Sequence, residues 1–175
     1  MAQSVQPVQS TKTIRFVLDA NVFINAHRLY YAFDIVPCFW RVLVELARRG
    51  LIASIDRVKD ELQKNDDPLK KWALSEFDHW FLSTDTEEVL DSYGQLMFWS
   101  FGNPHYEDVA KHQFADEADS WLVAFAKAYN YIVVTHEQPN HSPKKIKIPN
   151  ACKAMGVRYM NTFEMLRKLN VKVCA

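Results

Sequence analysis

The sequence has few glycines, few cysteines and no long apolar run, and each shortage excludes a class of protein. Its 175 residues include 4 glycines and 3 cysteines. So little glycine excludes collagen-like and low-complexity chains, and cysteines without a CxxC spacing do not form a zinc knuckle. No apolar run approaches the roughly 18 residues of a membrane-spanning helix. We therefore expect an ordinary globular protein without membrane association.

The charges are balanced, so no single sign dominates the surface. Lys and Arg together number 21, as do Asp and Glu, and the formal net charge is +0 at pH 7. Non-specific binding of nucleic acid usually relies on a broad basic field, which this composition does not provide. If a nucleic acid is the substrate, it must meet a local basic surface.

The length is that of one domain. Residues 1–13, reading MAQSVQPVQSTKT, lack the charged and apolar regions of a signal peptide, so we interpret them as a flexible lead. Residues 14–175 are predicted to form a single domain. The lack of a targeting signal favours a cytoplasmic location.

Strand-like and helix-like patterns alternate along this domain. The runs IRFVL and YIVVT are almost entirely apolar, which is typical of strands buried on both faces of a parallel sheet. Helical spacing of apolar residues predicts helices over residues 36–49 and 116–129. Strands are predicted over residues 14–18, 51–54, 79–83, 131–135 and 157–160. The alternation predicts an α/β fold whose parallel strands are joined by helical crossovers.

Acidic residues follow the predicted strands. Asp19 comes directly after the first strand, and Glu137 lies two residues beyond Thr135, where the fourth strand ends. Because the carboxyl ends of parallel strands share one edge, where open α/β sheets bind ligands, we expect these acids to converge. Asp116 and Asp119 are three residues apart in the predicted first turn of a helix and would share a face.

Glu61, on the helix predicted after the second strand, would add another carboxylate to this edge. Crowded carboxylates repel one another unless a cation lies between them, and Mg²⁺ and Mn²⁺ prefer oxygen ligands. Two such ions can activate a water and stabilise the leaving oxygen of a phosphodiester. The acids therefore predict a Mg²⁺ or Mn²⁺ site suited to hydrolysis of a nucleic-acid backbone.

Each acid also has a simpler interpretation. Asp19 would N-cap the following helix, Asp116 and Asp119 would complement a helix dipole, and Glu61 would be a solvated residue that competes with Asp60. The six histidines form neither an HxxxH nor an HxH pattern, so zinc is not indicated. The presence of several acids at the ends of elements favours the metal site.

The motifs, taken in this order, resemble the PIN domain, a metal-dependent ribonuclease fold. The resemblance rests on VLDANVFI at residues 17–24, on Glu61 followed by Leu62, and on ADSWLVAFAKAYNYIVVTHE at residues 118–137. The segments AFDIVPCFWRVL and KIKIPNAC are similar to a PIN-like branch of toxins from toxin–antitoxin modules. The resemblance implies a three-layer α/β/α sandwich around a central parallel sheet of about 4 to 5 short strands.

The resemblance also implies a role for most of the site residues, while Asp116 and the lysines beyond Glu137 are added from their positions in the sequence. The catalytic metal ligands would be Asp19, Glu61, Asp119 and Glu137, with Asp116 as a further metal ligand. Asn21 and Thr135 would orient the carboxylates through hydrogen bonds. Glu137 is longer than the Asp more usual in the family. The residues expected to contact the RNA backbone, unless they are a solvated loop, are Lys144, Lys145 and Lys147.

The function implied is that of a metal-dependent endoribonuclease, the toxin of a type II toxin–antitoxin system, silenced by an antitoxin protein. The alternative is a PIN-like RNA- or protein-binding module without turnover. A phosphatase of the haloacid-dehalogenase type is disfavoured, because it requires Asp-x-Asp and Asn21 stands at the second position. Exposed aromatics would suit a homodimer or antitoxin interface, and the candidates are Trp72, Phe77, Trp80, Phe98 and Trp99.

Overall fold

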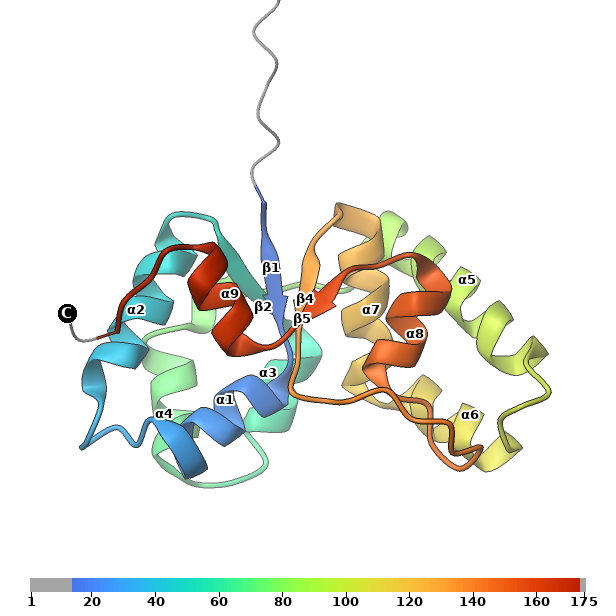
Figure 1. Ribbon diagram of the computed structural model, residues 1–175, viewed down its shortest axis with the longest axis horizontal. Helices are drawn as coiled ribbons and strands as arrows, with labels where there is room; N and C mark the ends of the chain where they lie inside the picture. The colour runs from blue at the N-terminus through green and yellow to red at the C-terminus, as the bar shows by residue number, and fades with distance from the viewer. Residues whose placement is uncertain (1–13, 174–175) are drawn as a thin grey trace, which may run out of the picture.

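A computed structural model gives the structure of the protein and describes residues 14–173 (Figure 1). The flexible lead expected at residues 1–13 lies outside the described residues. Within the described part, no helix combines the length and the apolarity that crossing a membrane requires.

A 5-stranded parallel sheet lies at the centre, in the order β3-β2-β1-β4-β5. Its strands are β1 (Phe16–Leu18), β2 (Ile52–Ile55), β3 (Phe81–Leu82), β4 (Ile132–Val134) and β5 (Tyr159–Met160). Phe16 pairs with Ile52 on one side and with Ile132 on the other, so β1 is the middle strand. The two strands that precede Asp19 and Glu137 are therefore neighbours, as the sequence predicts.

Helices cover both faces of the sheet (Figure 1). On one side lie α1 (Ala20–Asn25), the π-helix η1 (Ala26–Tyr30), α2 (Pro37–Arg48), α4 (Pro68–Ser75) and α9 (Thr162–Lys168). On the other lie α5 (Glu87–Gly102), α6 (Asp108–Asp116), α7 (Ala118–Tyr129) and α8 (Ile148–Met155). The remaining short helices are α3 (Asp56–Leu62) and the 3-10 helix η2 (Asp78–Trp80). The expected three-layer α/β/α architecture is confirmed.

The prediction of one helix over residues 116–129 is wrong about where that helix begins. Asp116 is the last residue of α6, and α7 begins at Ala118. Glu117 lies between the two helices with an extended backbone, φ −80° and ψ 154°. Asp116 and Asp119 therefore do not share a helical turn. The break has no sequence signal, because neither Gly nor Pro, the usual markers of an interruption, occurs in the segment ADEAD.

Aromatic side chains fill the core beside α4. The ring of Phe77 lies 5.5 Å from that of Phe23, 5.3 Å from that of Trp72 and 5.3 Å from that of Phe81, measured between centroids. Phe77 is 0% exposed. The cluster therefore packs α1 and α4 against β3.

Most of the aromatics proposed for an interface pack in or against the hydrophobic core instead. Trp72 and Phe77 are buried, and Trp80 and Trp99 are partly buried against the core. Phe98 on α5 is the exception, with 85% of its surface exposed. Core packing is thus the physical reason for four of the five, and the homodimer stays a prediction.

Truncation of Phe77 is expected to destabilise the protein strongly. Phe77→Ala removes a fully buried ring and leaves a cavity, which costs about 3–5 kcal/mol of unfolding free energy. The matched control, Phe98→Ala, removes an exposed ring and should change stability by less than about 0.5 kcal/mol. Urea unfolding measures both, and equal losses would contradict the packing described.

Candidate functional site

An acidic cleft opens at the carboxyl edge of the sheet, with a cavity volume of about 460 Å³. Its lining includes three cations, Arg57, Lys64 and Lys145, and the carboxamide of Asn21. The acids that line it are Asp19, Asp60, Glu61, Asp116, Glu117, Asp119 and Glu137. All five acids predicted as metal ligands are thus brought together, and the acids outnumber the cations.

Asp19 is the deepest of these acids. It follows β1 at the N-cap position of α1, yet its side chain makes no capping hydrogen bond, and it is 4% exposed. Its Oδ2 accepts a hydrogen bond from Thr135 Oγ1 at 2.8 Å. The capping interpretation therefore does not account for this carboxylate, because its contact runs across the sheet to the end of β4.

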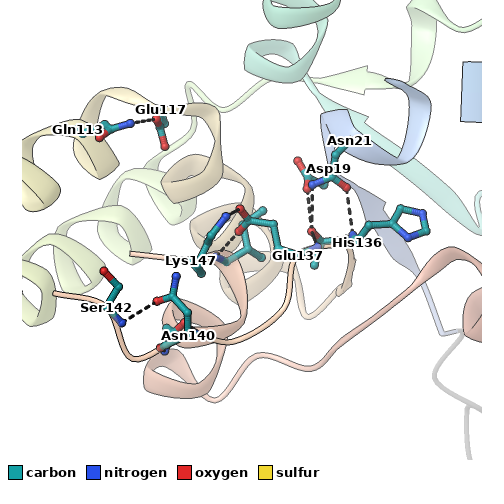
Figure 2. A network of polar contacts seen from close by, with 12 residues as sticks. Asp19, Asn21, Gln113, Glu117, His136, Glu137, Asn140, Ser142 and Lys147 are labelled. Carbon is teal, nitrogen blue, oxygen red and sulfur yellow. Dashed lines mark hydrogen bonds and ion pairs between the residues drawn. The ribbon is translucent and has the colours of Figure 1, made fainter. Parts of the chain in front are cut away.

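A short polar network fixes the end of β4 to the start of α1 (Figure 2). Asn21 Nδ2 donates to Thr135 Oγ1 at 3.4 Å, and the backbone N–H of His136 donates to Asn21 Oδ1 at 3.0 Å. The backbone N–H of Glu137 donates to Thr135 Oγ1 at 3.1 Å. Thr135 is 2% exposed. This geometry supports the predicted role of Asn21 and Thr135 in orienting Asp19.

The carboxylates raise one another's pKa. Burial is the main cause for Asp19, whose pKa rises to about 7 although the Thr135 hydrogen bond opposes the rise, and the charges of Glu137 and Glu61 add to it. Burial, followed by the charges of Asp19 and Glu137, raises the pKa of Asp119 to about 8. Burial also raises the pKa of Glu61. The cleft therefore disfavours its own ionised acids when no cation is bound.

Glu137 is held by the segment that follows it. Its Oε1 accepts from Lys147 Nζ at 2.5 Å, and its Oε2 accepts from the backbone N–H of Ile148, the first residue of α8, at 2.8 Å. Figure 2 shows Glu137 and Lys147 meeting beside α8. Both carboxylate oxygens thus have a partner, so Glu137 anchors the loop before α8 as well as lining the cleft.

The three predicted RNA-contacting lysines occupy different environments. Lys145 lines the cleft, and its charge lowers the pKa of Glu61 and Asp119. Lys144 is exposed, outside the lining residues. Lys147 is engaged by Glu137. Lys145 is therefore the one of the three that lines the cleft, whereas the charge of Lys147 is paired with Glu137.

The donor set fits a hard divalent cation. Carboxylate and carboxamide oxygens are the ligands that Mg²⁺ and Mn²⁺ prefer. Across residues 14–173, no three His, Cys, Asp or Glu side chains are already gathered closely enough to hold an ion. Mg²⁺, however, commonly uses one or two protein carboxylates and keeps several waters. Asp19 and Asp119, which both line the cleft, meet that smaller requirement.

Three charged lining residues were missed by sequence reasoning: Arg57, Lys64 and Glu117. Glu117 lies at the unpredicted break between α6 and α7. Arg57 precedes Glu61 by four residues on α3, a spacing that places both on one helix face. That spacing was available in the sequence and would have indicated a cation beside the predicted acid.

Comparisons with known proteins agree with this fold. A family described as "Domain of unknown function (DUF4411)" matches residues 16–173. The chain is similar to FitAcB from Neisseria gonorrhoeae, at 19% identity and a TM-score of 0.50, over 85% of this chain and 98% of that one. It is also similar to VapBC2 from Rickettsia felis bound to a DNA fragment from their promoter, at 18% identity and a TM-score of 0.49, with the same coverage of 85% and 98%. No curated protein matches the sequence.

At these identities the likeness is one of fold. FitAcB shares this overall fold, and the parallel five-stranded sheet with helices on both faces is the architecture of a PIN-like fold. The PIN-like fold implied by the sequence motifs is therefore confirmed.

Stability without divalent ions is expected to fall as the pH rises from about 4 to about 8. In the unfolded chain an aspartate loses its proton near its ordinary pKa of 3.8, whereas folded Asp19 and Asp119 keep theirs up to about 7 and about 8. The folded state then binds more protons than the unfolded state across this window, so a rise in pH favours unfolding.

Urea unfolding of the wild type and of Asp119→Asn in EDTA, across this pH range, measures the effect. The variant cannot ionise at position 119, so its stability should depend less steeply on pH. An equally steep dependence in both proteins would show that the cleft acids do not titrate as described.

Proposed function

The chain belongs to the family described as a domain of unknown function, DUF4411, and we propose that it is a metal-dependent endoribonuclease. The observation that carries the proposal is the crowding of acids at the carboxyl edge of a PIN-like sheet, where burial and the charges of neighbouring acids raise the pKa of both Asp19 and Asp119. Such crowding is unfavourable for folding alone and becomes favourable when a divalent cation is bound.

Asp19 and Asp119 would hold Mg²⁺ or Mn²⁺, with Glu61 as a third ligand. When bound, the ion supplies charge stabilisation for a phosphodiester and lowers the pKa of a coordinated water. Thr135 keeps Asp19 in place by donating a hydrogen bond to it, and Asn21 in turn donates to Thr135. Glu137 and Asp116 are proposed as additional metal ligands. Both carboxylate oxygens of Glu137 already accept hydrogen bonds from Lys147 and Ile148, so it would have to share them with the ion.

We propose RNA as the substrate, with Lys145 as one contact to its backbone. Lys145 lines the cleft, and its ammonium lies close enough to Glu61 and Asp119 to lower their pKa. A point charge in this position would attract a phosphate toward the acids and partly offset their repulsion of it.

We further propose that the enzyme is the toxin of a toxin–antitoxin module. The motif resemblance supports this, and so does the fold likeness to FitAcB, a toxin–antitoxin complex. The excess of acids in the cleft is complementary to a basic side chain, so an antitoxin could silence the nuclease by placing an Arg or Lys among them.

A binding module without turnover is the second candidate. It is favoured by the two hydrogen bonds that occupy Glu137 and by the lack of a preformed three-ligand cluster among the described residues. This candidate keeps the fold and the cleft but predicts no metal-dependent cleavage.

Purified protein is expected to cleave single-stranded RNA with Mg²⁺ or Mn²⁺ and to stop in EDTA. Asp19→Asn and Asp119→Asn should each lower the rate by more than about 100-fold, since residues that only orient metal ligands already contribute about 10- to 100-fold. Thr135→Val should fall in that smaller range. Asp91→Asn, at an exposed position on α5 outside the cleft, is the matched control. Equal rates for the wild type and Asp19→Asn would leave the binding module as the better account.

The neighbouring acids Asp60 and Glu61 provide a second test of the ligand set. Both line the cleft, but Glu61 is partly buried with a pKa raised by burial, whereas Asp60 is exposed. Glu61→Gln should therefore lower the metal-dependent cleavage rate strongly, while Asp60→Asn changes it little. The reverse order would assign the ligand role to Asp60.

A further inference from the structure

Arg57 is a cation that the cleft holds in a fixed position. It is the second residue of α3, and its guanidinium carbon lies 3.8 Å from the centroid of the Trp121 ring. Its Nε donates a hydrogen bond to Thr84 Oγ1 at 3.2 Å. One face of the guanidinium is therefore covered by an aromatic ring, and one edge is fixed by a hydroxyl.

Both supports are themselves held by the protein. Trp121 stacks on Tyr93, with centroids 3.9 Å apart and planes 14° apart, and the Tyr93 hydroxyl donates to Ala115 O at 2.9 Å. The two stacking partners of Trp121 must lie on opposite faces of its ring, so the indole has no face left for a nucleic-acid base. Its position suits it to orient the cation.

Thr84 is fixed by the residue that precedes Arg57. The Thr84 backbone N–H donates to Asp56 Oδ2 at 2.9 Å, and its hydroxyl donates to Asp56 Oδ1 at 2.8 Å. Thr84 is 2% exposed. The hydroxyl that accepts from Arg57 is thus part of a closed network between the start of α3 and the segment after β3.

The remaining edge of the guanidinium is free to bind a ligand. Arg57 is exposed and lines the cleft. Between residues 14 and 173, no ion pair includes Arg57 and no hydrogen bond uses its terminal nitrogens Nη1 and Nη2. A cation whose role was to neutralise the cleft acids would bind one of them, and Arg57 binds none.

We propose that Arg57 binds a backbone phosphate of the RNA substrate through Nη1 and Nη2. This inference rests on the proposed function and identifies the residue that docks the nucleic acid at the cleft. The planar fork of a guanidinium matches two phosphate oxygens, and stacking on an aromatic ring orients it before the ligand arrives. An anionic chain approaching seven acids requires such a fixed positive contact.

The salt dependence of RNA binding tests the contact directly. Fluorescence anisotropy would measure the Kd of a labelled single-stranded RNA of about 12 nucleotides, within the usual site sizes, with Ca²⁺ in place of Mg²⁺ across a salt series. Loss of one phosphate contact on a single strand reduces the slope of log Kd against log salt by about 0.7. Arg57→Gln should show this reduction, and Arg57→Lys should keep the slope while binding more weakly. Arg48→Gln, on α2 outside the cleft, is the matched control and should match the wild type.

The outcomes separate this inference from the proposed nuclease activity. If the wild type cleaves no RNA but Arg57→Gln still reduces the slope, the nuclease proposal fails and the phosphate contact stands. If the wild type does not bind the RNA, or if Arg57→Gln retains the wild-type slope, Arg57 does not bind phosphate. A slope reduced equally in Arg57→Lys and Arg57→Gln would also overturn the inference, since the lysine keeps the charge.

Discussion

The repulsion between buried carboxylates at one edge of the sheet is the constraint on which the rest of the site depends. Asp19 follows the central strand β1 and is 4% exposed, and Asp119 is the second residue of α7, the helix that leads into the neighbouring strand β4. Because burial and the charges of neighbouring acids raise the pKa of both Asp19 and Asp119, the surrounding groups act to hold or offset these charges. Thr135 donates to Asp19, and Lys145 moderates Asp119.

The basic residues near the cleft differ in their contacts, and each contact indicates a different role. Lys147 is paired with Glu137 at the start of α8 and fixes the loop that carries Lys145. Lys145 faces the acids, and Arg57 stacks on Trp121 without pairing with any described acid. The chain has no net charge, yet two basic residues, Lys145 and Arg57, lie at the acidic cleft. Such a local basic surface is what a nucleic-acid substrate would need in a protein of balanced charge.

The local sequence pattern was sufficient to predict the position of those site residues that directly follow a strand. The apolar runs before Asp19 and Thr135 predict buried parallel neighbours, and the structure pairs Phe16 with Ile132. Contacts that depend on the folded path of a loop had no such signal, so the engagement of Glu137 by Lys147 was not foreseen. The extended residue Glu117 was likewise missed, since nothing in the local sequence marks the break.

The central claim, that this cleft is a divalent cation site, is tested most directly by isothermal titration calorimetry of Mn²⁺ into the metal-free protein. The account predicts saturable binding to the wild type, loss of that binding in Asp19→Asn and Asp119→Asn, and wild-type binding in Asp91→Asn. Absence of binding in the wild type, or the same binding in all four proteins, would contradict it.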